Sequence, residues 1–337
     1  MIKWQDCSEQ NLQIILPAIN PSPWNVPSIE AAQSELVFPV SLEFGSVWKK
    51  GPHSDSVQDL LDALVVLGKT FSQLICFGQN RTRTKIKTSP TDLVTEIDAG
   101  VEMLFRIWIN RFFPHHKIIG EEGNHDLISP TDFVWYIDPV DGTHNYVHQI
   151  PFVGINMGCL KAGKPYVSFV GKPFEKEYFY ACDEGPVFKE TEKEKVQLTP
   201  QLNSTTIIGT EYRNSPNTER KFNSILKNLN AKSFECKSIT VNLASLLEGK
   251  TTAFYKSSAK AWDIIAPAML INRLYSDQFC CEIIFLDTKD EIDLFSNSER
   301  LIGQLNRPDN PEKRTGLCLI YPKSRPDIKR AILHEYE

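Results

Sequence analysis

The chain has 337 residues, of which 41% are hydrophobic and 23% are charged; this is an ordinary globular composition, long enough for two modest domains. Its net charge of -5 lacks the basic footprint needed to bind nucleic-acid phosphates, so no nucleic-acid partner is expected. The eight cysteines include no Cys-x-x-Cys pair, which predicts reduced thiols rather than a zinc site or a disulfide scaffold.

The sequence also lacks the usual signals for membranes and secretion. Its best uninterrupted apolar run, Ala63 to Leu67, is far shorter than a membrane-spanning helix needs. The first residues, Met-Ile-Lys-Trp-Gln-Asp, lack the charged-then-apolar order of a secretory signal. A cytoplasmic protein with no membrane partner is therefore expected.

The first 55 residues carry no chemistry that their pattern identifies. A turn-rich stretch, Asn-Pro-Ser-Pro-Trp-Asn-Val-Pro, occupies residues 20–27, and residues 38–48 could supply one or two strands. We interpret residues 1–55 as an N-terminal extension of unknown role.

Residues 56–200 are predicted to form an N-terminal α+β half. Apolar side chains at helical spacing predict a helix over 59–77 and a second over 97–112, which Pro114 ends. Short strands are expected at 117–120, 133–137, 153–160 and 166–170. Helices followed by a largely antiparallel sheet indicate a layered architecture.

Residues 201–337 are predicted to form a C-terminal α/β half. Strands are expected at 205–209, 253–255 and 317–321. Helices are expected at 217–229, 241–247 and 325–333. Another helix begins at Trp262 and is expected to kink or shift at Pro267, since proline lacks an N–H donor and crowds the preceding turn.

Five acidic residues stand at the boundaries of these elements: Asp98, Glu121, Asp138, Asp141 and Asp263. Each alone has a structural explanation, because boundary acids usually cap helices or form turns. Thr95-x-x-Asp98, for example, fits a helix capping box in which the acid needs no other role.

The most informative stretch runs from 135 to 147. Asp138 and Asp141 flank a Pro-Val pair at the end of an apolar run, and Gly142 and Thr143 follow at once. This order predicts a strand that delivers carboxylates to its tip, then a turn whose amides face an anion. Hard oxygens suit Mg²⁺ and helix-start amides suit phosphate, so we expect metal-assisted phosphate chemistry.

The five boundary acids lie within four motifs. The first is Lys87-Thr-Ser-Pro-Thr-Asp-Leu-Val-Thr-Glu-Ile-Asp98 and the second is Ile119-Gly-Glu-Glu-Gly. The third is Asp138-Pro-Val-Asp-Gly-Thr-His-Asn-Tyr-Val and the fourth is Ala261-Trp-Asp263. In content and order they resemble the motifs of the inositol monophosphatase family of Mg²⁺-dependent, often lithium-sensitive phosphatases. Chance agreement of four ordered motifs is far rarer than a single match. The resemblance covers about residues 57–335 and implies an α/β (α+β) fold, the layered αβαβα sandwich of the inositol monophosphatase and sugar phosphatase type.

The resemblance also implies two or three Mg²⁺ ions. Glu121, Asp138 and the Val140 carbonyl would hold one ion, while Asp138, Asp141 and Asp263 would hold a second. Two ions about 4 Å apart can clamp the attacking and leaving oxygens of an in-line displacement. On this basis Asp138 is expected to bridge the two ions.

The remaining expected roles concern water and substrate. Glu121, with Thr143 hydrogen-bonded to Asp98, would orient and deprotonate the attacking water. Asp141, Gly142 and Thr143 would bind the substrate. Lys87 is either a further substrate ligand or a solvated member of a basic stretch. His144 is not expected to bind the metal, because hard oxygen sites rarely recruit imidazole.

Two features depart from the family. Inositol-selective members place a glutamate seven residues before the Trp-Asp aspartate, where this chain has Lys256, with Lys260 nearby. Lys256 is either a solvated lysine or a ligand for a second anionic group. The family's glycines after Trp-Asp are also missing, since Ile264-Ile-Ala-Pro267 and later Tyr275-Ser-Asp-Gln stand in their place.

The function expected from these residues is a Mg²⁺-dependent phosphomonoesterase acting on a small metabolite such as inositol monophosphate. One alternative is a phosphatase for a bisphosphorylated substrate: fructose 1,6-bisphosphate, adenosine 3′,5′-bisphosphate or NADP. Another is a catalytically idle relative that binds a metabolite. The resemblance leaves a homodimer open, and it decides neither the natural substrate nor lithium sensitivity.

Overall fold

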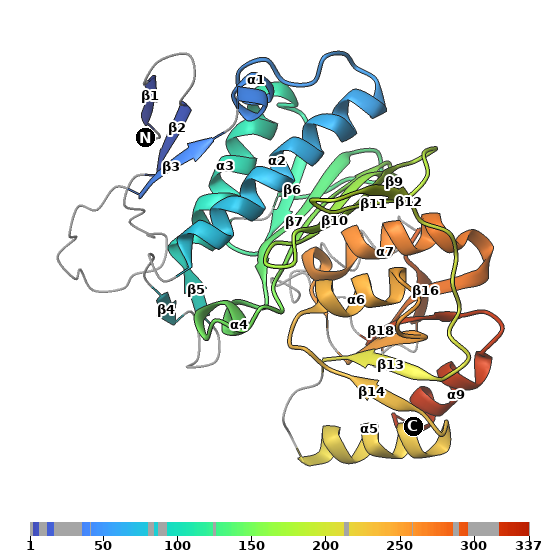
Figure 1. Ribbon diagram of the computed structural model, residues 1–337. Helices are drawn as coiled ribbons and strands as arrows, with labels where there is room; N and C mark the ends of the chain where they lie inside the picture. The colour runs from blue at the N-terminus through green and yellow to red at the C-terminus, as the bar shows by residue number, and fades with distance from the viewer. Residues whose placement is uncertain are drawn as a thin grey trace.

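The computed structural model describes residues 3–6, 12–16, 36–40, 42–79, 84–86, 93–123, 126–211, 216–257, 259–285, 290–295 and 317–336. Two large sheets dominate this part of the chain, and helices lie outside and between them (Figure 1). Layers of this kind form because each sheet has two faces whose apolar side chains must be covered.

The first sheet has seven strands in the order β12-β11-β10-β9-β8-β7-β6. Its strands are β6 (Lys117–Gly120), β7 (Phe133–Asp141), β8 (Gly154–Lys161), β9 (Lys164–Lys172), β10 (Glu177–Cys182), β11 (Phe188–Glu190) and β12 (Lys195–Gln197). Only β6 and β7 pair in parallel, which confirms the expected largely antiparallel sheet.

The second sheet has six strands in the order β14-β13-β15-β18-β16-β17. Its strands are β13 (Ile207–Thr210), β14 (Lys232–Phe234), β15 (Ala253–Lys256), β16 (Phe279–Phe285), β17 (Asp290–Asp293) and β18 (Leu317–Pro322). The strands β13, β14 and β15 run parallel to one another, so the carboxyl ends of β13 and β15 meet at one edge.

Three helix layers cover the sheets (Figure 1). Helices α2 (Val57–Gly78) and α3 (Glu96–Phe112) pack on the outer face of the first sheet. Helices α6 (Ile239–Leu247) and α7 (Ala261–Tyr275) lie between the sheets and contact both. Helices α5 (Pro216–Asn228) and α9 (Pro326–His334) share a core with the far face of the second sheet. The result is an αβαβα sandwich, as expected.

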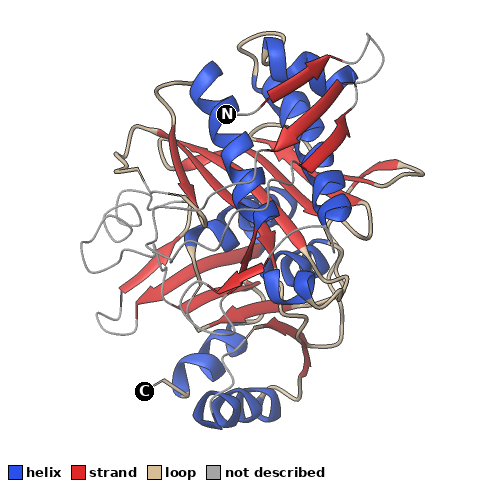
Figure 2. Cartoon of the chain, turned by 90° about the vertical axis from the view of Figure 1, so that its left-hand side faces the viewer, coloured by secondary structure: helices blue, strands red, loops and turns tan. Residues whose placement is uncertain are grey.

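The N-terminal region differs in part from expectation. It contains a three-stranded sheet, β1 (Lys3–Asp6), β2 (Leu12–Leu16) and β3 (Leu36–Val40), and then helix α1 (Leu42–Lys50). The prediction of strands over 38–48 is therefore right only at its start. The rest of the segment forms the helix α1, which packs against α2 and contains the buried Trp48. Here tertiary packing outweighs the strand preference of aromatic and β-branched residues. Figure 2 shows this sheet at the opposite end of the molecule from the C-terminal helices.

Helix α2 is more apolar than its longest uninterrupted run suggested. By length and composition alone its 22 residues could cross a membrane, since its most apolar 18-residue stretch has a mean hydropathy of 1.6. However, 61% of that stretch is buried, and α2 packs on β9 and β10. This burial is the pattern of a core helix in a layered protein.

Helix α7 continues through Pro267, whose ring nitrogen cannot donate to the Asp263 carbonyl. Instead, the Asn156 side-chain amide donates to that carbonyl at 3.2 Å and to Thr240 Oγ1 at 2.7 Å. Asn156 lies on β8 and is fully buried. One β8 side chain therefore joins the starts of α6 and α7 and occupies the acceptor that proline leaves free.

Candidate active site

The tip of β7 contains a bulge that sets the direction of its two acids. Asp138 pairs with Asn156 of β8 and Asp141 pairs with Gly154, so three steps on β7 oppose two on β8. In a regular strand, residues three apart point to opposite faces. The extra residue in the bulge compensates for this, so both carboxylates lie on the same face of the sheet. It is the face from which the Asn156 side chain contacts α6 and α7. Pro139 is tolerated here because a bulge needs no ladder N–H.

Asp141 is held at the start of α6. Its Oδ2 accepts hydrogen bonds from Ser238 Oγ at 2.6 Å and from the Thr240 backbone N–H at 2.5 Å. Burial, followed by the nearby Glu211 carboxylate, raises the pKa of Asp141 to about 6, against the lowering effect of these bonds. The helix start stabilises this carboxylate without cancelling the cost of burying it.

Asp263 is held in the same way at the start of α7. Its Oδ2 accepts from the Lys260 backbone N–H at 3.0 Å, so the helix-capping explanation is correct as far as it goes. Burial, then the Asp141 and Glu121 carboxylates, raise the pKa of Asp263 well above its ordinary value, while Lys256 opposes the shift. The Asp263 side chain therefore caps a helix and also belongs to the acidic cluster of Glu121, Asp138, Asp141 and Asp263.

Asp138 is the least satisfied of the acids. It is 1% exposed, and within the described residues its Oδ1 has no hydrogen-bond partner. Burial raises its pKa first, and the carboxylates of Glu121, Asp141 and Asp263 raise it further. A side-chain hydrogen bond with Glu121 acts in the same direction. Two carboxyl groups can share such a bond only when one is protonated, so these oxygens lie close together.

Asp98 and Thr143 join the starts of α3 and α4 (Thr143–Val147). Thr143 Oγ1 lies 3.1 Å from Asp98 Oδ1 and 3.0 Å from the Val140 carbonyl oxygen. Asp98 Oδ2 also accepts from the Thr95 backbone N–H at 3.0 Å and from the Thr95 hydroxyl, which completes the capping box. The expected hydrogen bond between Thr143 and Asp98 is present. Gly142 precedes α4 with φ at 88°, where a Cβ would meet the Phe152 carbonyl oxygen at 2.9 Å.

These oxygens fit a divalent metal ion by their chemistry. The donors are hard carboxylates and one carbonyl, three of the acids repel one another, and one buried oxygen is unpaired. Across the described ranges, however, no three His, Cys, Asp or Glu side chains already form a group that could hold an ion. Asp141 and Asp263 each direct one oxygen to helix-start donors, which leaves each a second oxygen for a cation.

The basic residues of the prediction fall into two cases. Lys87 lies outside the described residues. Lys256 is only 17% exposed, and its Nζ lies 2.7 Å from Glu211 Oε2. The interpretation of Lys256 as a solvated lysine is therefore wrong, because the side chain is mostly buried in an ion pair. The His144 ring is tilted against that of His148, with ring centroids 4.5 Å apart, and His144 lies on the exposed side of α4.

Sequence reasoning missed several residues around the acids. Glu102 is buried, pairs with Arg106 at 2.7 Å and accepts from the Glu122 backbone N–H at 2.7 Å, so it holds the turn that carries Glu121. Glu211 and Asn156 were also missed. For Glu102 the sequence offered one signal, an acidic residue inside a predicted helix. Glu211 and Asn156 offered none, since they reach the site through strand pairings far apart in sequence.

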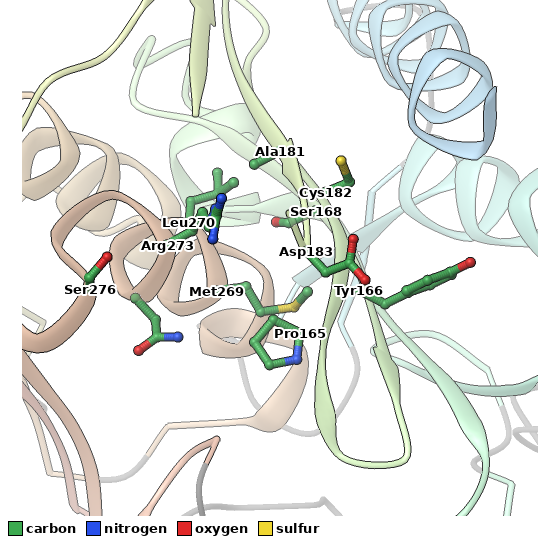
Figure 3. A pocket seen from close by; sticks show the side chains of 11 residues that line it. Pro165, Tyr166, Ser168, Ala181, Cys182, Asp183, Met269, Leu270, Arg273 and Ser276 are labelled. Atoms are coloured by element: carbon green, nitrogen blue, oxygen red, sulfur yellow. The ribbon is translucent and has the colours of Figure 1, made fainter. Parts of the chain in front are cut away.

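A separate cavity of about 310 Å³ opens between β9, β10 and the C-terminal half of α7 (Figure 3). Its wall includes Tyr166, Asp183 and Arg273, and none of its lining residues belongs to the acidic cluster. Arg273 donates to the carbonyl oxygens of Glu184 and Gly185, both at 2.6 Å. Beyond it Ser276 has a φ of 46° and a ψ of −121°, a positive-φ conformation that favours glycine.

Comparison with known proteins gives consistent results. The model of the inositol monophosphatase family matches residues 57–273. Inositol monophosphatase 1 of Homo sapiens is 26% identical over 239 residues, covering 65% of this chain and 82% of the relative. Inositol monophosphatase 3 of Solanum lycopersicum is 31% identical over 230 residues, covering 64% and 84%. A solved IMPase/NADP phosphatase complexed with Mg²⁺ and phosphate has a TM-score of 0.64 at 20% identity, covering 82% of this chain and 95% of the other.

The structural likeness confirms the αβαβα fold. Inositol monophosphatase homologues are phosphomonoester hydrolases, so the expected enzyme class is confirmed as well. The family match spans more than half of the chain and includes all five boundary acids. This protein therefore belongs to the inositol monophosphatase family.

Proposed function

We propose that the chain is a Mg²⁺-dependent phosphomonoesterase whose site is the acidic cluster of Glu121, Asp138, Asp141 and Asp263. The observation that carries the proposal is the buried Asp138 carboxylate, with an unpaired Oδ1 and three acidic neighbours that raise its pKa. Such an arrangement is costly for an empty protein and becomes favourable when a divalent cation balances the charge.

The proposed ligands are those that the family resemblance implies. Glu121, Asp138 and the Val140 carbonyl would hold one ion, and Asp138, Asp141 and Asp263 a second. Bound Mg²⁺ supplies charge stabilisation for the phosphoryl oxygens and lowers the pKa of a coordinated water. The count of ions, two or three, belongs to this proposal.

The chain's own groups then position the reactants. Thr143 Oγ1, which lies within hydrogen-bond distance of Asp98 and of the Val140 carbonyl, would orient the attacking water. Glu121 would take the proton from that water. Gly142 and Thr143 lie where the chain turns from β7 into α4, and their backbone amides would face the phosphate together with Asp141. Lys87 is retained as a substrate ligand in this proposal only.

The favoured substrate is a small polyol phosphate such as inositol monophosphate, as the names of the relatives suggest. The bisphosphate alternative depended on Lys256 as a free cation, and the ion pair with Glu211 weakens that reason. The IMPase/NADP phosphatase among the solved structures keeps NADP on the list of substrates to test.

The test is phosphate release from four substrates: inositol 1-phosphate, fructose 1,6-bisphosphate, adenosine 3′,5′-bisphosphate and NADP. We expect turnover with Mg²⁺, loss of turnover with excess EDTA and recovery on adding Mg²⁺ again. Measurable Mg²⁺ binding with no turnover on any of the four would instead support a catalytically idle, metabolite-binding relative.

A further inference from the structure

One face of α3 contacts both of the elements that the proposed function assigns to the attacking water. Asp98 and Glu102 are four residues apart in α3 and lie on the same face, about 6 Å apart along the helix axis. Thr143 Oγ1 lies 3.1 Å from Asp98 Oδ1. The Glu122 backbone N–H, in the turn that carries Glu121, donates to Glu102 Oε2 at 2.7 Å. Consecutive turns of one helix therefore contact Thr143 and the turn of Glu121.

The Glu102 carboxyl group fills the space that two glycines leave open. A Cβ atom at Gly120 would lie 2.5 Å from Glu102 Cδ, and one at Gly123 would lie 2.5 Å from Glu102 Oε1. Neither glycine has a positive φ, so close contact, and not backbone conformation, excludes a side chain at both positions. Residues 120–123 are thus wrapped around one carboxyl group, and the Glu102 residue is only 2% exposed.

Further contacts fix this carboxyl group and its turn. Arg106 Nε lies 2.7 Å from Glu102 Oε1, one helical turn further along α3. On the other side of the turn, the Glu121 backbone N–H donates to the Ile137 carbonyl oxygen of β7 at 3.3 Å. Ile137 directly precedes Asp138. The turn is therefore held between α3 and the end of the strand that carries Asp138.

We propose that Glu102 is a positioning residue of the phosphatase site, which sets the distance between the Glu121 carboxylate and Thr143. This inference rests on the proposed function, in which Glu121 binds Mg²⁺ and takes a proton from the attacking water. Glu102 acts through the turn and not on the substrate. A displacement of about 1 Å at a reacting group can cost about 100-fold in rate, so the length of the Glu102 side chain matters more than its charge.

The test is a series of substitutions at position 102. Glu102→Gln keeps the length of the side chain and an acceptor oxygen, whereas Glu102→Asp keeps the charge and shortens the side chain. We expect kcat for inositol 1-phosphate and Mg²⁺ affinity, measured by titration calorimetry, to fall about tenfold in Glu102→Gln and about 100-fold in Glu102→Asp and Glu102→Ala. KM should change less than kcat. Milder losses in Glu102→Asp than in Glu102→Gln would show that charge decides, and would overturn the positioning role.

A double-mutant cycle tests the contact between Glu102 and the turn. Gly120→Ala should lower kcat and Mg²⁺ affinity about tenfold in the wild type, because its methyl group collides with the Glu102 carboxyl group. The same substitution should cost nothing further in Glu102→Ala, where that group is absent. Losses that simply add would overturn the inference.

The matched control is Glu190→Ala. Glu190 accepts from Lys69 Nζ at 2.5 Å and from the Tyr180 hydroxyl at 2.6 Å, and three strands separate its strand β11 from β7. This variant should lose stability but keep wild-type kcat and Mg²⁺ affinity.

The outcomes separate the two proposals. A folded Glu102→Ala protein with wild-type kcat and Mg²⁺ affinity overturns the positioning role. A wild type that binds Mg²⁺ without turnover overturns the phosphatase function, and Mg²⁺ affinity alone then decides the role of Glu102. If Glu102→Ala does not fold, Glu102→Gln decides: unchanged kcat and Mg²⁺ affinity in that variant also overturn the role.

Discussion

Two groups of mostly buried charged side chains in the described part of the chain behave in opposite ways. In one group, Lys172, Glu177 and Lys189 of the first sheet and Glu248 at the end of α6 alternate in sign, with N–O separations of 2.9, 2.7 and 2.6 Å. Burial raises the pKa of Glu177, but its two lysine partners outweigh burial and hold that pKa below its ordinary value. We call this group the lysine–glutamate chain.

The acidic cluster has no such balance. Burial and neighbouring carboxylates together raise the pKa of Asp138 and of Asp263, and burial with Glu211 raises that of Asp141. In the lysine–glutamate chain every charge has a partner of opposite sign, so the group contributes to folding and requires no ligand. The acidic cluster is incomplete, and a cation is what would complete it.

The largest expected effect comes from Asp138→Asn. The substitution keeps the size of the side chain and removes the charge that both proposed ions share. We expect phosphatase activity to fall by more than about 100-fold, beyond the loss that outer groups cause at metal sites. Phosphate release at saturating Mg²⁺ measures this effect.

The same variant should not lose stability along with its activity. Without Mg²⁺, Asp138→Asn should melt no lower than the wild type, since a buried repulsion is removed. The control Asp132→Asn alters an acid that accepts from the Ser129 backbone N–H at 2.7 Å, and it should keep its activity. An Asp138→Asn enzyme with near wild-type turnover would place the metal site elsewhere.

The acidic cluster also predicts how the metal-free protein responds to pH. The pKa of Asp141 rises to about 6 on folding from an ordinary value of 3.8, so between these values the folded state binds more protons than the unfolded state. Stability therefore falls as pH rises from about 4 to about 6, on the order of 3 kcal/mol from Asp141 alone. Asp138 and Asp263 act in the same direction.

Melting temperatures from pH 4.5 to 8 should show this loss in EDTA. Added Mg²⁺ should restore stability most strongly at the upper end, where the carboxylates are ionised. A metal-free protein that becomes steadily more stable up to pH 7 would contradict the repulsion argument.

Much of the fold followed from apolar periodicity, and the exceptions have physical reasons. The helices over 57–78 and 96–112 and the strands at the centres of both sheets were predicted because each carries a long apolar pattern. Strand β10 was not predicted, although Glu177 to Cys182 is buried on both faces as β7 is, because periodicity alone does not identify such a short buried run as a strand. The helix α1 was missed because its burial depends on contacts with α2.

The site shows the same division. The boundary acids were predicted from local motifs, and the Thr143–Asp98 hydrogen bond followed from them. The bulge between Asp138 and Asp141 was not predicted, because it is defined by pairing with β8. The partner of Lys256 was also missed, since Glu211 lies 45 residues away in sequence and meets it only through parallel strands.

The support beneath the acids gives a smaller expected effect. Asn156→Ala removes the donors to Thr240 and to the Asp263 carbonyl, and so loosens the starts of α6 and α7. We expect Mg²⁺ affinity or activity to fall about 10- to 100-fold, the usual range for outer groups at metal sites. Ser168→Ala is the matched control, because its hydroxyl bonds the Ala266 carbonyl at 2.8 Å in the same helix. Equal loss of Mg²⁺ affinity in both variants would show a general effect of α7 packing instead.

The smallest expected effect lies in the lysine–glutamate chain and completes the comparison. Glu177→Gln leaves Lys172 with Glu175 and Lys189 with Glu248, so each lysine keeps a partner. The free energy of unfolding should fall by about 1 kcal/mol, between the values for exposed and fully buried pairs. Urea denaturation measures that change, and Mg²⁺ should not alter it, because this group has no unbalanced charge for a cation to neutralise. A Glu177→Gln protein whose stability or activity depends on Mg²⁺ differently from the wild type would show that the two charged groups are coupled. Separate behaviour of the two groups would support a folding role for one and the proposed metal binding for the other.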